Sequence, residues 1–443
     1  MRASALLAWA CASAAWAGNL WSSQDGSSAL EGKAFYKALG TGVRLAPGLV
    51  VETAELARLL DQPGVALPGS GASTGHVVRL EGKAHYQELL ELDVAYQLGA
   101  LVASHPAFTG GASLTGAFTA EGGGPQRRLV DLPGTLYSSP GLRVDQNLDR
   151  LSARLSLKFA DVIVGRQVLS WGTGRFWNPT DLLSPFAPTE IDREVRRGID
   201  AVRVTAPLFS RTAQLEVLWL PRKVAEENGG AVRAQVNVLG YDVSLSGAKY
   251  VDDLLAGADF SGDVGPVGVH GEAAYTWGIR SGERALRAVV GAEVRPTEKL
   301  ALTAEYYFNG FGARDASGYL AALSSPRAQR GEISGAGRHY LGVAASYAFT
   351  ELLTLQLLSL VNLQDPSAEL VPVLEYWFEQ SVILRAGAFV PIGGAPDPTA
   401  LRGMTAADLG TPAFQDAAST LGLRSEYGLL SYGAMVQVGV YFQ

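Results

Sequence analysis

The sequence predicts an all-β protein, a closed antiparallel transmembrane β-barrel of about eighteen strands with one loop folded inward to form a constriction. Three observations lead to this fold class. Residues 430–442 alternate strictly between apolar and mixed side chains, which is the period of a β-strand with two unlike faces. The chain is 47% hydrophobic, yet no segment beyond its first residues reads as a transmembrane helix. Without helices, only a closed barrel pairs every backbone group inside lipid.

The last strand also suggests where the protein is delivered. One face of this strand is predicted to carry Leu430, Tyr432, Ala434, Val436, Val438, Val440 and Phe442. A terminal strand that ends on an aromatic residue resembles the closing strand and assembly signal of bacterial outer-membrane barrels, although Gln443 follows Phe442 here. This resemblance implies the outer membrane of a Gram-negative bacterium, contact with its lipid, and recognition by the barrel assembly machinery.

The first seventeen residues read as a Sec signal peptide. Arg2 supplies the positive charge, residues 5–15 the apolar region, and Ala15-Trp16-Ala17 the cleavage site. We therefore expect residues 1–17 to be cleaved and residues 18–443 to form a single barrel domain. Cleavage removes Cys11, the one cysteine of the chain, which leaves the mature protein without disulfides or thiolate chemistry.

Alternation and turn residues divide the remaining chain into segments of the length that a tilted membrane strand needs. We expect strands at residues 29–40, 76–87, 90–103, 145–158, 161–170, 198–207, 211–221, 231–238, 241–250, 252–261, 266–277, 284–295, 298–309, 338–350, 351–364, 367–379, 380–391 and 429–442. The connections between them are alternately tight and open, and the longest cover residues 41–75, 104–144, 171–197, 310–337 and 392–428. Short periplasmic turns and long external loops are typical of outer-membrane barrels, and they put both termini in the periplasm.

The same alternation predicts which side chains face the lumen. In residues 76–87, Val78 and Leu80 face lipid whereas Arg79 and Lys83 face inward, because a basic residue on the lipid face costs about 2–4 kcal/mol. The lumen wall is predicted to include Arg79, Lys83, Arg154, Lys158, Arg166, Arg203, Glu272, Glu305, Glu375 and Arg385. Inward acids and bases are near balance, so the wall alone predicts no strong ion selectivity. These charges suit a polar, hydroxyl-rich solute, or they form a cross-barrel web of ion pairs without a substrate role.

The segment between the strands at 161–170 and 198–207 is rich in aromatic, glycine and charged residues. An exposed surface loop rarely carries so many large aromatic side chains, so we expect this loop to fold into the lumen as a constriction. Asn178 and Pro179 have the residue types of a helix N-cap and first helical position, which predicts a short helix. The residues assigned to the constriction are Trp171, Arg175, Phe176, Trp177, Asp181, Glu190, Asp192, Arg193, Arg196 and Arg197.

The strands that flank this loop carry a family resemblance. Gly165-Arg166-Gln167 before the loop and Asp200-Ala201-Val202-Arg203 after it resemble alginate-export-type and related outer-membrane porins. That group includes barrels proposed to pass secreted polysaccharides together with periplasmic export proteins. The resemblance implies that Arg166, Asp200 and Arg203 lie at the lumen wall beneath the loop. Alginate exporters have strongly basic lumens, and the balanced charges of this chain depart from that pattern.

Reaction chemistry finds little support in the sequence, so we do not expect an enzyme. The histidines lack metal-ligand spacing, and we expect no metal, no cofactor and no nucleic-acid partner. A hydrolase site inside the barrel would most simply use His270 near Glu272. The simpler interpretation is that His270 is part of the polar wall. The acids Glu190, Asp192 and Glu194 are more simply paired with neighbouring arginines than with a cation.

These observations predict a passive outer-membrane conduit. The leading hypothesis is secretion of a cell-surface polysaccharide or exopolysaccharide with a periplasmic polysaccharide export protein. The alternative is a diffusion porin for the uptake of small polar solutes. A third hypothesis is a non-conducting barrel whose long loops bind a surface partner.

Overall fold

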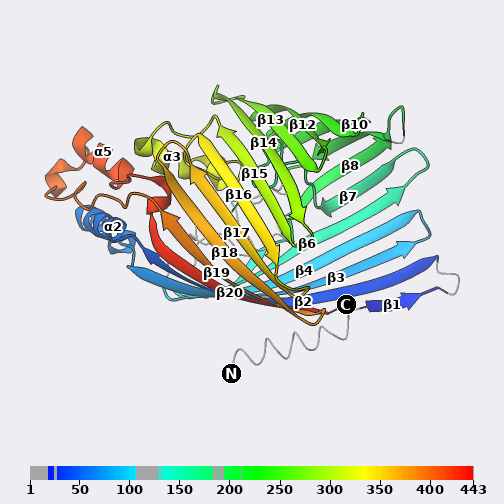
Figure 1. The fold of residues 1–443 in the computed structure, drawn as a ribbon, viewed down its shortest axis with the longest axis horizontal. Coiled ribbons are helices and arrows are strands. Elements are labelled where there is room, and N and C mark those ends of the chain that lie inside the picture. The colour runs from blue at the N-terminus through cyan, green and yellow to red at the C-terminus, as the bar shows by residue number, and fades with distance from the viewer. Residues whose placement is uncertain are drawn as a thin grey trace.

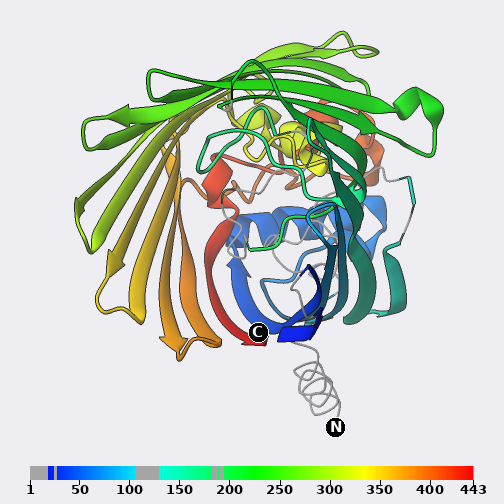
Figure 2. The ribbon, with the colours of Figure 1, turned by 90° about the vertical axis from the view of Figure 1, so that its right-hand side faces the viewer.

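Eighteen strands close into one antiparallel ring in the computed structural model (Figures 1 and 2). The structure describes residues 18–23, 27–105, 129–130, 132–181, 183, 188, 194–210 and 212–442. Each ring strand pairs with its neighbour in sequence, and β20 pairs with β2 to close the circle. The predicted fold class and strand number are therefore confirmed. The expected signal peptide, residues 1–17, lies outside the described residues.

The ring strands match the predicted segments one for one. They are β2 (Ser28–Leu45), β3 (Ser70–Tyr86), β4 (Leu90–Ala103), β6 (Leu142–Ser156), β7 (Asp161–Gln167), β8 (Ile199–Pro207), β9 (Ala213–Leu220), β10 (Gly229–Val238), β11 (Tyr241–Tyr250), β12 (Asp253–Val264), β13 (Val267–Gly278), β14 (Arg284–Thr297), β15 (Leu300–Asn309), β16 (His339–Ala348), β17 (Leu353–Asn362), β18 (Ser367–Phe378), β19 (Val382–Ile392) and β20 (Leu430–Phe442).

Two further strands lie beside the ring, and the sequence analysis missed both. β1 (Gly18–Ser22) pairs with β2 just beyond the point where β20 ends, so it continues the same edge. β5 (Gly134–Ser139) pairs with the start of β6, on the edge that β7 occupies further along. Each has only five or six residues, which is too few for alternation to stand out.

The repeated sequence Leu-Glu-Gly-Lys-Ala, at residues 30–34 and again at 80–84, forms two neighbouring strands. The copies pair with each other in antiparallel register about Gly32 and Gly82. The repeated sequence therefore forms one antiparallel pair of similar strands.

Alternation of side chains across the wall follows the prediction for the last strand. Tyr432, Val436 and Val438 are exposed on the outer face of β20, whereas Met435 and Gln437 are buried on the inner face. Exposed large apolar side chains recur on the outer faces of the other strands, as a lipid-facing surface requires.

Helices occur in the connections, mostly at one end of the barrel (Figure 1). The α-helices are α2 (Pro47–Leu60), α3 (Tyr319–Leu323), α4 (Pro326–Gln329) and α5 (Pro412–Thr420), and the 3-10 helices are η2 (Pro63–Val65), η4 (Ala225–Glu227), η5 (Ala316–Gly318), η6 (Ala406–Asp408) and η7 (Glu426–Gly428). The short turns lie at the opposite end, where Tyr441 donates its backbone N–H to Ser381. Across the described part of the chain, none of the helices has the length and apolarity needed to cross a membrane.

One predicted wall residue lies outside the wall. β6 ends at Ser156, so Lys158 is an exposed residue of the short turn to β7 and not an inward side chain of the strand. Leu157 and Ala160 close this turn with a backbone hydrogen bond of 2.8 Å, which ends the ladder two residues earlier than the alternation suggested.

A matched pair of charged substitutions tests the orientation of β17. Leu357, near the middle of the strand, is exposed on the outer face, and its neighbour Gln356 lines the lumen. We expect Leu357→Arg to lower the free energy of unfolding by about 2–4 kcal/mol, because the arginine enters lipid. Gln356→Arg should lower the free energy of unfolding far less, because its charge remains in the water of the lumen. Denaturant unfolding in liposomes measures both values, and equal losses would contradict this orientation.

Candidate functional site

The candidate site begins at β7 and β8, which are among the shortest strands of the ring. β7 has seven residues and β8 has nine, and the described residues between them, 168–181, 183, 188 and 194–198, lie outside these two strands. At its neck Arg166 and Asp200 are direct cross-strand partners. Arg166 donates from Nε and Nη2 to the two carboxylate oxygens of Asp200, at 2.8 and 3.0 Å, and from Nη1 to the carbonyl of Leu148 at 2.9 Å. This bidentate pair fixes the spacing of the strands from which the loop departs.

Two inward carboxylates on the facing wall hold the backbone of the loop. Glu272 of β13 accepts hydrogen bonds from the backbone N–H groups of Thr173, at 2.9 Å, and Thr180, at 2.5 Å. Glu305 of β15 accepts from the backbone N–H groups of Arg175 and Phe176. Both glutamates are buried, and hydrogen bonds to a buried carboxylate are charge-assisted. The loop is therefore attached to the wall through its main chain at four points.

Glycine is required where the loop passes over Glu272. Gly172 has a φ of 94°, and a Cβ there would lie 2.6 Å from both Glu272 and the Asn178 side chain. Only glycine combines this backbone conformation with this close approach.

Aromatic packing extends the attachment toward β16. The Trp177 ring stacks on Tyr307 of β15 with centroids 5.1 Å apart and an interplanar angle of 14°. Phe176 packs edge-on against Trp177, and a Cβ at Gly342 would lie 2.6 Å from the Phe176 ring. Such ring pairs contribute about 0.5–1.5 kcal/mol beyond the area that they bury.

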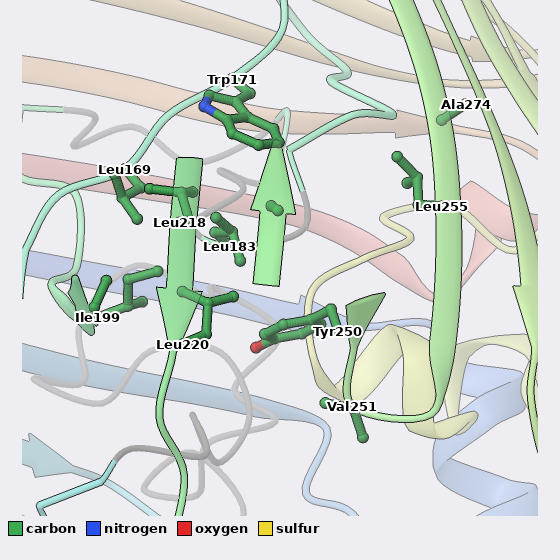
Figure 3. Close-up of a cluster of buried hydrophobic side chains, with 12 residues drawn as sticks. Leu169, Trp171, Leu183, Ile199, Leu218, Leu220, Tyr250, Val251, Leu255 and Ala274 are labelled. Carbon is green, nitrogen blue, oxygen red and sulfur yellow. The ribbon is translucent and has the colours of Figure 1, made fainter. Parts of the chain in front are cut away.

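A second apolar cluster lies at the start of the loop. Leu169 and Trp171 pack with Leu218 and Leu220 of β9 and with residues of β11 to β13 (Figure 3). The indole Nε1 of Trp171 donates to Glu216 at 2.6 Å, which satisfies its one polar atom in a buried position.

The far end of the loop reaches the opposite wall. Glu194 accepts hydrogen bonds from Lys37 of β2 at 2.7 Å, from Arg385 of β19 at 3.1 Å and from Tyr441 of β20 at 2.7 Å. Burial favours the neutral acid, but the hydrogen bonds from Lys37, Tyr441 and Arg385 outweigh it and hold the pKa of Glu194 below its usual value. The loop thus crosses the lumen and is tethered on both sides.

The described constriction residues divide into packed and ion-paired groups. Trp171, Phe176 and Trp177 are buried against the wall. Arg175 pairs with Glu293 at 2.8 Å, Asp181 pairs with Arg196 at 2.7 Å, and Arg197 is half-buried near the neck. The other predicted constriction residues, Glu190, Asp192 and Arg193, lie outside the described residues.

The predicted helix at Asn178 is wrong as far as the structure describes it. Residues 179 and 180 form a turn, closed by the backbone N–H of Asp181 on the carbonyl of Asn178 at 3.0 Å. The N–H of Thr180 donates to Glu272, so the wall carboxylate also binds this turn.

Neighbouring ion pairs account for most of the predicted wall charges. Arg79 pairs with Asp149 at 2.9 Å, and the remaining pairs are Lys83 with Glu91, Arg154 with Asp161, Arg203 with Glu216, and Arg385 with Glu375. Glu272 and Glu305 bind the loop instead. His270 is bonded to Glu305 at 2.7 Å and not to Glu272. His270 and Glu305 are both buried beneath the loop that Glu305 binds.

The loop leaves an open cavity on the side of the lumen away from β8 to β13. This cavity has a volume of about 450 Å³ and lies between Phe176 of the loop and the inner faces of β15 to β19. Its wall includes hydroxyl and amide groups, apolar side chains, and the charged groups Glu194, Glu375 and Arg385.

The sequence analysis did not anticipate that Glu272 and Glu305 act through the backbone of the loop. Both were assigned to the wall, but their partners are peptide N–H groups about a hundred residues away in sequence. The available signal was their position on strands opposite the loop, at inward positions without a basic residue directly across on the neighbouring strand.

Comparison with solved structures shows a shared fold at low sequence identity. Pseudomonas aeruginosa OccD3 (OpdP) is 9% identical, with a TM-score of 0.52 over 97% of this chain and 94% of that one. Pseudomonas aeruginosa OccK5 (OpdH) is also 9% identical, with a TM-score of 0.50 over 93% and 98%. A mutant of the Rh. blastica porin is 12% identical, with a TM-score of 0.42 over 93% and 100%. No protein-family model and no curated protein matches the sequence.

The fold is therefore that of an outer-membrane β-barrel of the porin type, which places the protein in the outer membrane of a Gram-negative bacterium. The similarity found is to porins, and it gives no support to the resemblance to alginate exporters that the strands flanking the loop suggested.

Removal of one loop-binding carboxylate should release the loop. We expect Glu272→Ala to increase the rate of tryptic cleavage within residues 171–197 by roughly tenfold or more, because hydrogen bonds to a charged group contribute about 1.5–3 kcal/mol. The matched control is Glu293→Ala, which removes an exposed ion pair with Arg175 of little expected energy. Limited proteolysis in detergent measures both rates. Equal cleavage of the two variants and wild type would show that Glu272 does not hold the loop.

The tether at Glu194 should respond to acid in a defined direction. Because the pKa of Glu194 is lowered, the tether is fully formed above the ordinary glutamate pKa of about 4.3 and is lost only as the pH falls through the lowered pKa. We expect current fluctuations in planar bilayers to stay constant from about pH 8 to 5 and to increase below about pH 4.

The current through the Glu194→Gln channel should fluctuate at every pH and should show no further increase in fluctuations below pH 4. A variant with the same step as wild type would assign the acid response to another group.

Proposed function

We propose that the protein is a passive diffusion channel through which small polar solutes enter the cell. The observation that carries this proposal is the position of the loop, which is attached to one side of the lumen and leaves a cavity on the other. A loop fixed in this way sets an upper limit on solute size without closing the path. The comparisons support the same proposal, because the fold is that of porins.

The charge pattern supports a channel with little ion selectivity. A ring of one charge sign is the usual source of strong selectivity. Here the basic groups of the wall pair with neighbouring acids, so the lumen presents no field of one sign. Small solutes would then be distinguished by size and by the polarity of the surface they contact.

Secretion of a polysaccharide has weaker support. A polymer needs a continuous wide bore, whereas the loop crosses the lumen and is tethered at Glu194 on the opposite wall. The backbone bonds to Glu272 and Glu305 make this loop a poor movable gate.

Single-channel recording tests the proposed function. We expect the wild-type protein to conduct steadily in planar bilayers, and replacement of residues 172–197 by a short Gly-Ser linker to raise the conductance by roughly twofold or more, because the loop occupies part of the lumen. Deletion of residues 406–420, which include α5 outside the ring, is the control and should leave the conductance unchanged. A wild-type protein closed to ions would overturn the proposal.

A further inference from the structure

The wall of the barrel has one part with many charged residues and one part with few. The five neighbouring strands β16 to β20 contain only three Asp, Glu, Lys or Arg residues, namely Glu369, Glu375 and Arg385. The two strands β3 and β4, which together are about half as long, contain five. Charged side chains are therefore much denser in one part of the wall than in the other.

Apolar side chains take several inward positions of the part with few charges. Val371 and Val373 of β18 are buried on the inner face, while Leu374 beside them is 43% exposed on the outer face. The inward residues of five neighbouring strands pack into one cluster of Leu39, Leu358, Val371, Val373, Phe389 and Met435. This cluster faces the lumen instead of lipid, so the membrane does not explain it.

The cavity beside the loop lies against this apolar surface. Leu358, Val371 and Val373 line one part of it, and the Phe176 ring of the loop lines another. Thr303, Ser346 and Gln356 add hydroxyl and amide groups. A volume of about 450 Å³ is within the range of small-molecule sites, which are mostly apolar with a few polar groups.

The charged groups at the edge of the cavity satisfy one another. Arg385 donates from Nε to Glu375 at 2.8 Å, from Nη1 to Gln437 at 3.0 Å and from Nη2 to Glu194 at 3.1 Å. A solute with a net charge would have to compete with these bonds, and removal of one partner from such a pair is costly. A zwitterionic or neutral head can contact both signs without displacing either.

We infer that this cavity is a subsite for amphipathic solutes without net charge, which place an apolar body against Leu358, Val371 and Val373 and a polar head toward Glu194, Glu375 and Arg385. This inference rests on the proposed channel function and names the substrate class of the same lumen. Contact of this kind is weak, as conduction requires, because a solute that binds tightly does not leave.

Liposome swelling with matched amino acids tests the inference. Leucine and asparagine share the same zwitterionic head and are close in size, so their entry rates differ through the side chain. We expect leucine to enter wild-type proteoliposomes severalfold faster than asparagine. N-acetyl-leucine, an anion, and leucinamide, a cation, should both enter more slowly than leucine.

Two variants and one control assign this preference to the cavity. Val371→Thr combined with Val373→Thr keeps the side-chain shapes and adds hydroxyl groups, so the leucine-to-asparagine ratio should fall toward one. Gln356→Leu enlarges the apolar surface and should raise the ratio. Val43→Thr makes the same change at a buried inward position of β2 outside the cavity and should leave the ratio unchanged.

A wild-type ratio of one, or a ratio that neither cavity variant changes, would overturn the inference. Potassium chloride conductance is recorded on every preparation, because a protein that conducts no ions refutes the channel function itself, whereas a conducting protein without the preference refutes only the subsite. Heat-modifiable electrophoretic mobility shows that each variant is folded, and Gln356→Leu provides an independent test if the threonine variant does not fold.

Discussion

The attachment of a loop backbone to two buried carboxylates is the constraint on which the rest of the lumen depends. Peptide N–H groups that leave a β-ladder need other acceptors, and Glu272 and Glu305 supply them from the facing wall. These bonds select glycine at Gly172, where the chain passes over Glu272, and bring Trp177 onto the rings of Tyr307 in β15 and Tyr340 in β16. The loop therefore crosses the lumen as a fixed partition, with a cavity on one side.

The two sides of the barrel wall differ in what they contact: one side packs against the loop and the other borders the cavity. On the side of β8 to β15, carboxylates and aromatic rings support the loop, and the apolar cluster around Trp171 resembles the core of a soluble protein. On the side of β16 to β20, most inward residues are uncharged, and those of β16 to β18 border the cavity. The pair Arg166 and Asp200 joins β7 to β8 at the position where the chain leaves the wall and where it returns.

Local periodicity was sufficient to predict the barrel but not its interior. All eighteen ring strands follow from alternation, since each strand must present one apolar face to lipid, whereas β1 and β5 are too short to show a period. Lys158 was misplaced because a turn ended the strand early, and the segment expected to start a helix at Asn178 forms a turn that is bonded to Glu272 on the facing wall. Such contacts join residues about a hundred positions apart, and they depend on ring closure and register that spacing alone does not give.

The most direct test of this account is thiol modification of single cysteines inside the lumen during current recording. Ser346→Cys on β16 borders the open cavity, whereas Ala274→Cys on β13 is fully buried behind the loop. The account predicts that a charged thiol reagent reduces the current through the Ser346→Cys channel and leaves that through the Ala274→Cys channel unchanged. Block of the Ala274→Cys channel, or no block of the Ser346→Cys channel, would contradict a loop fixed against the wall of β8 to β15.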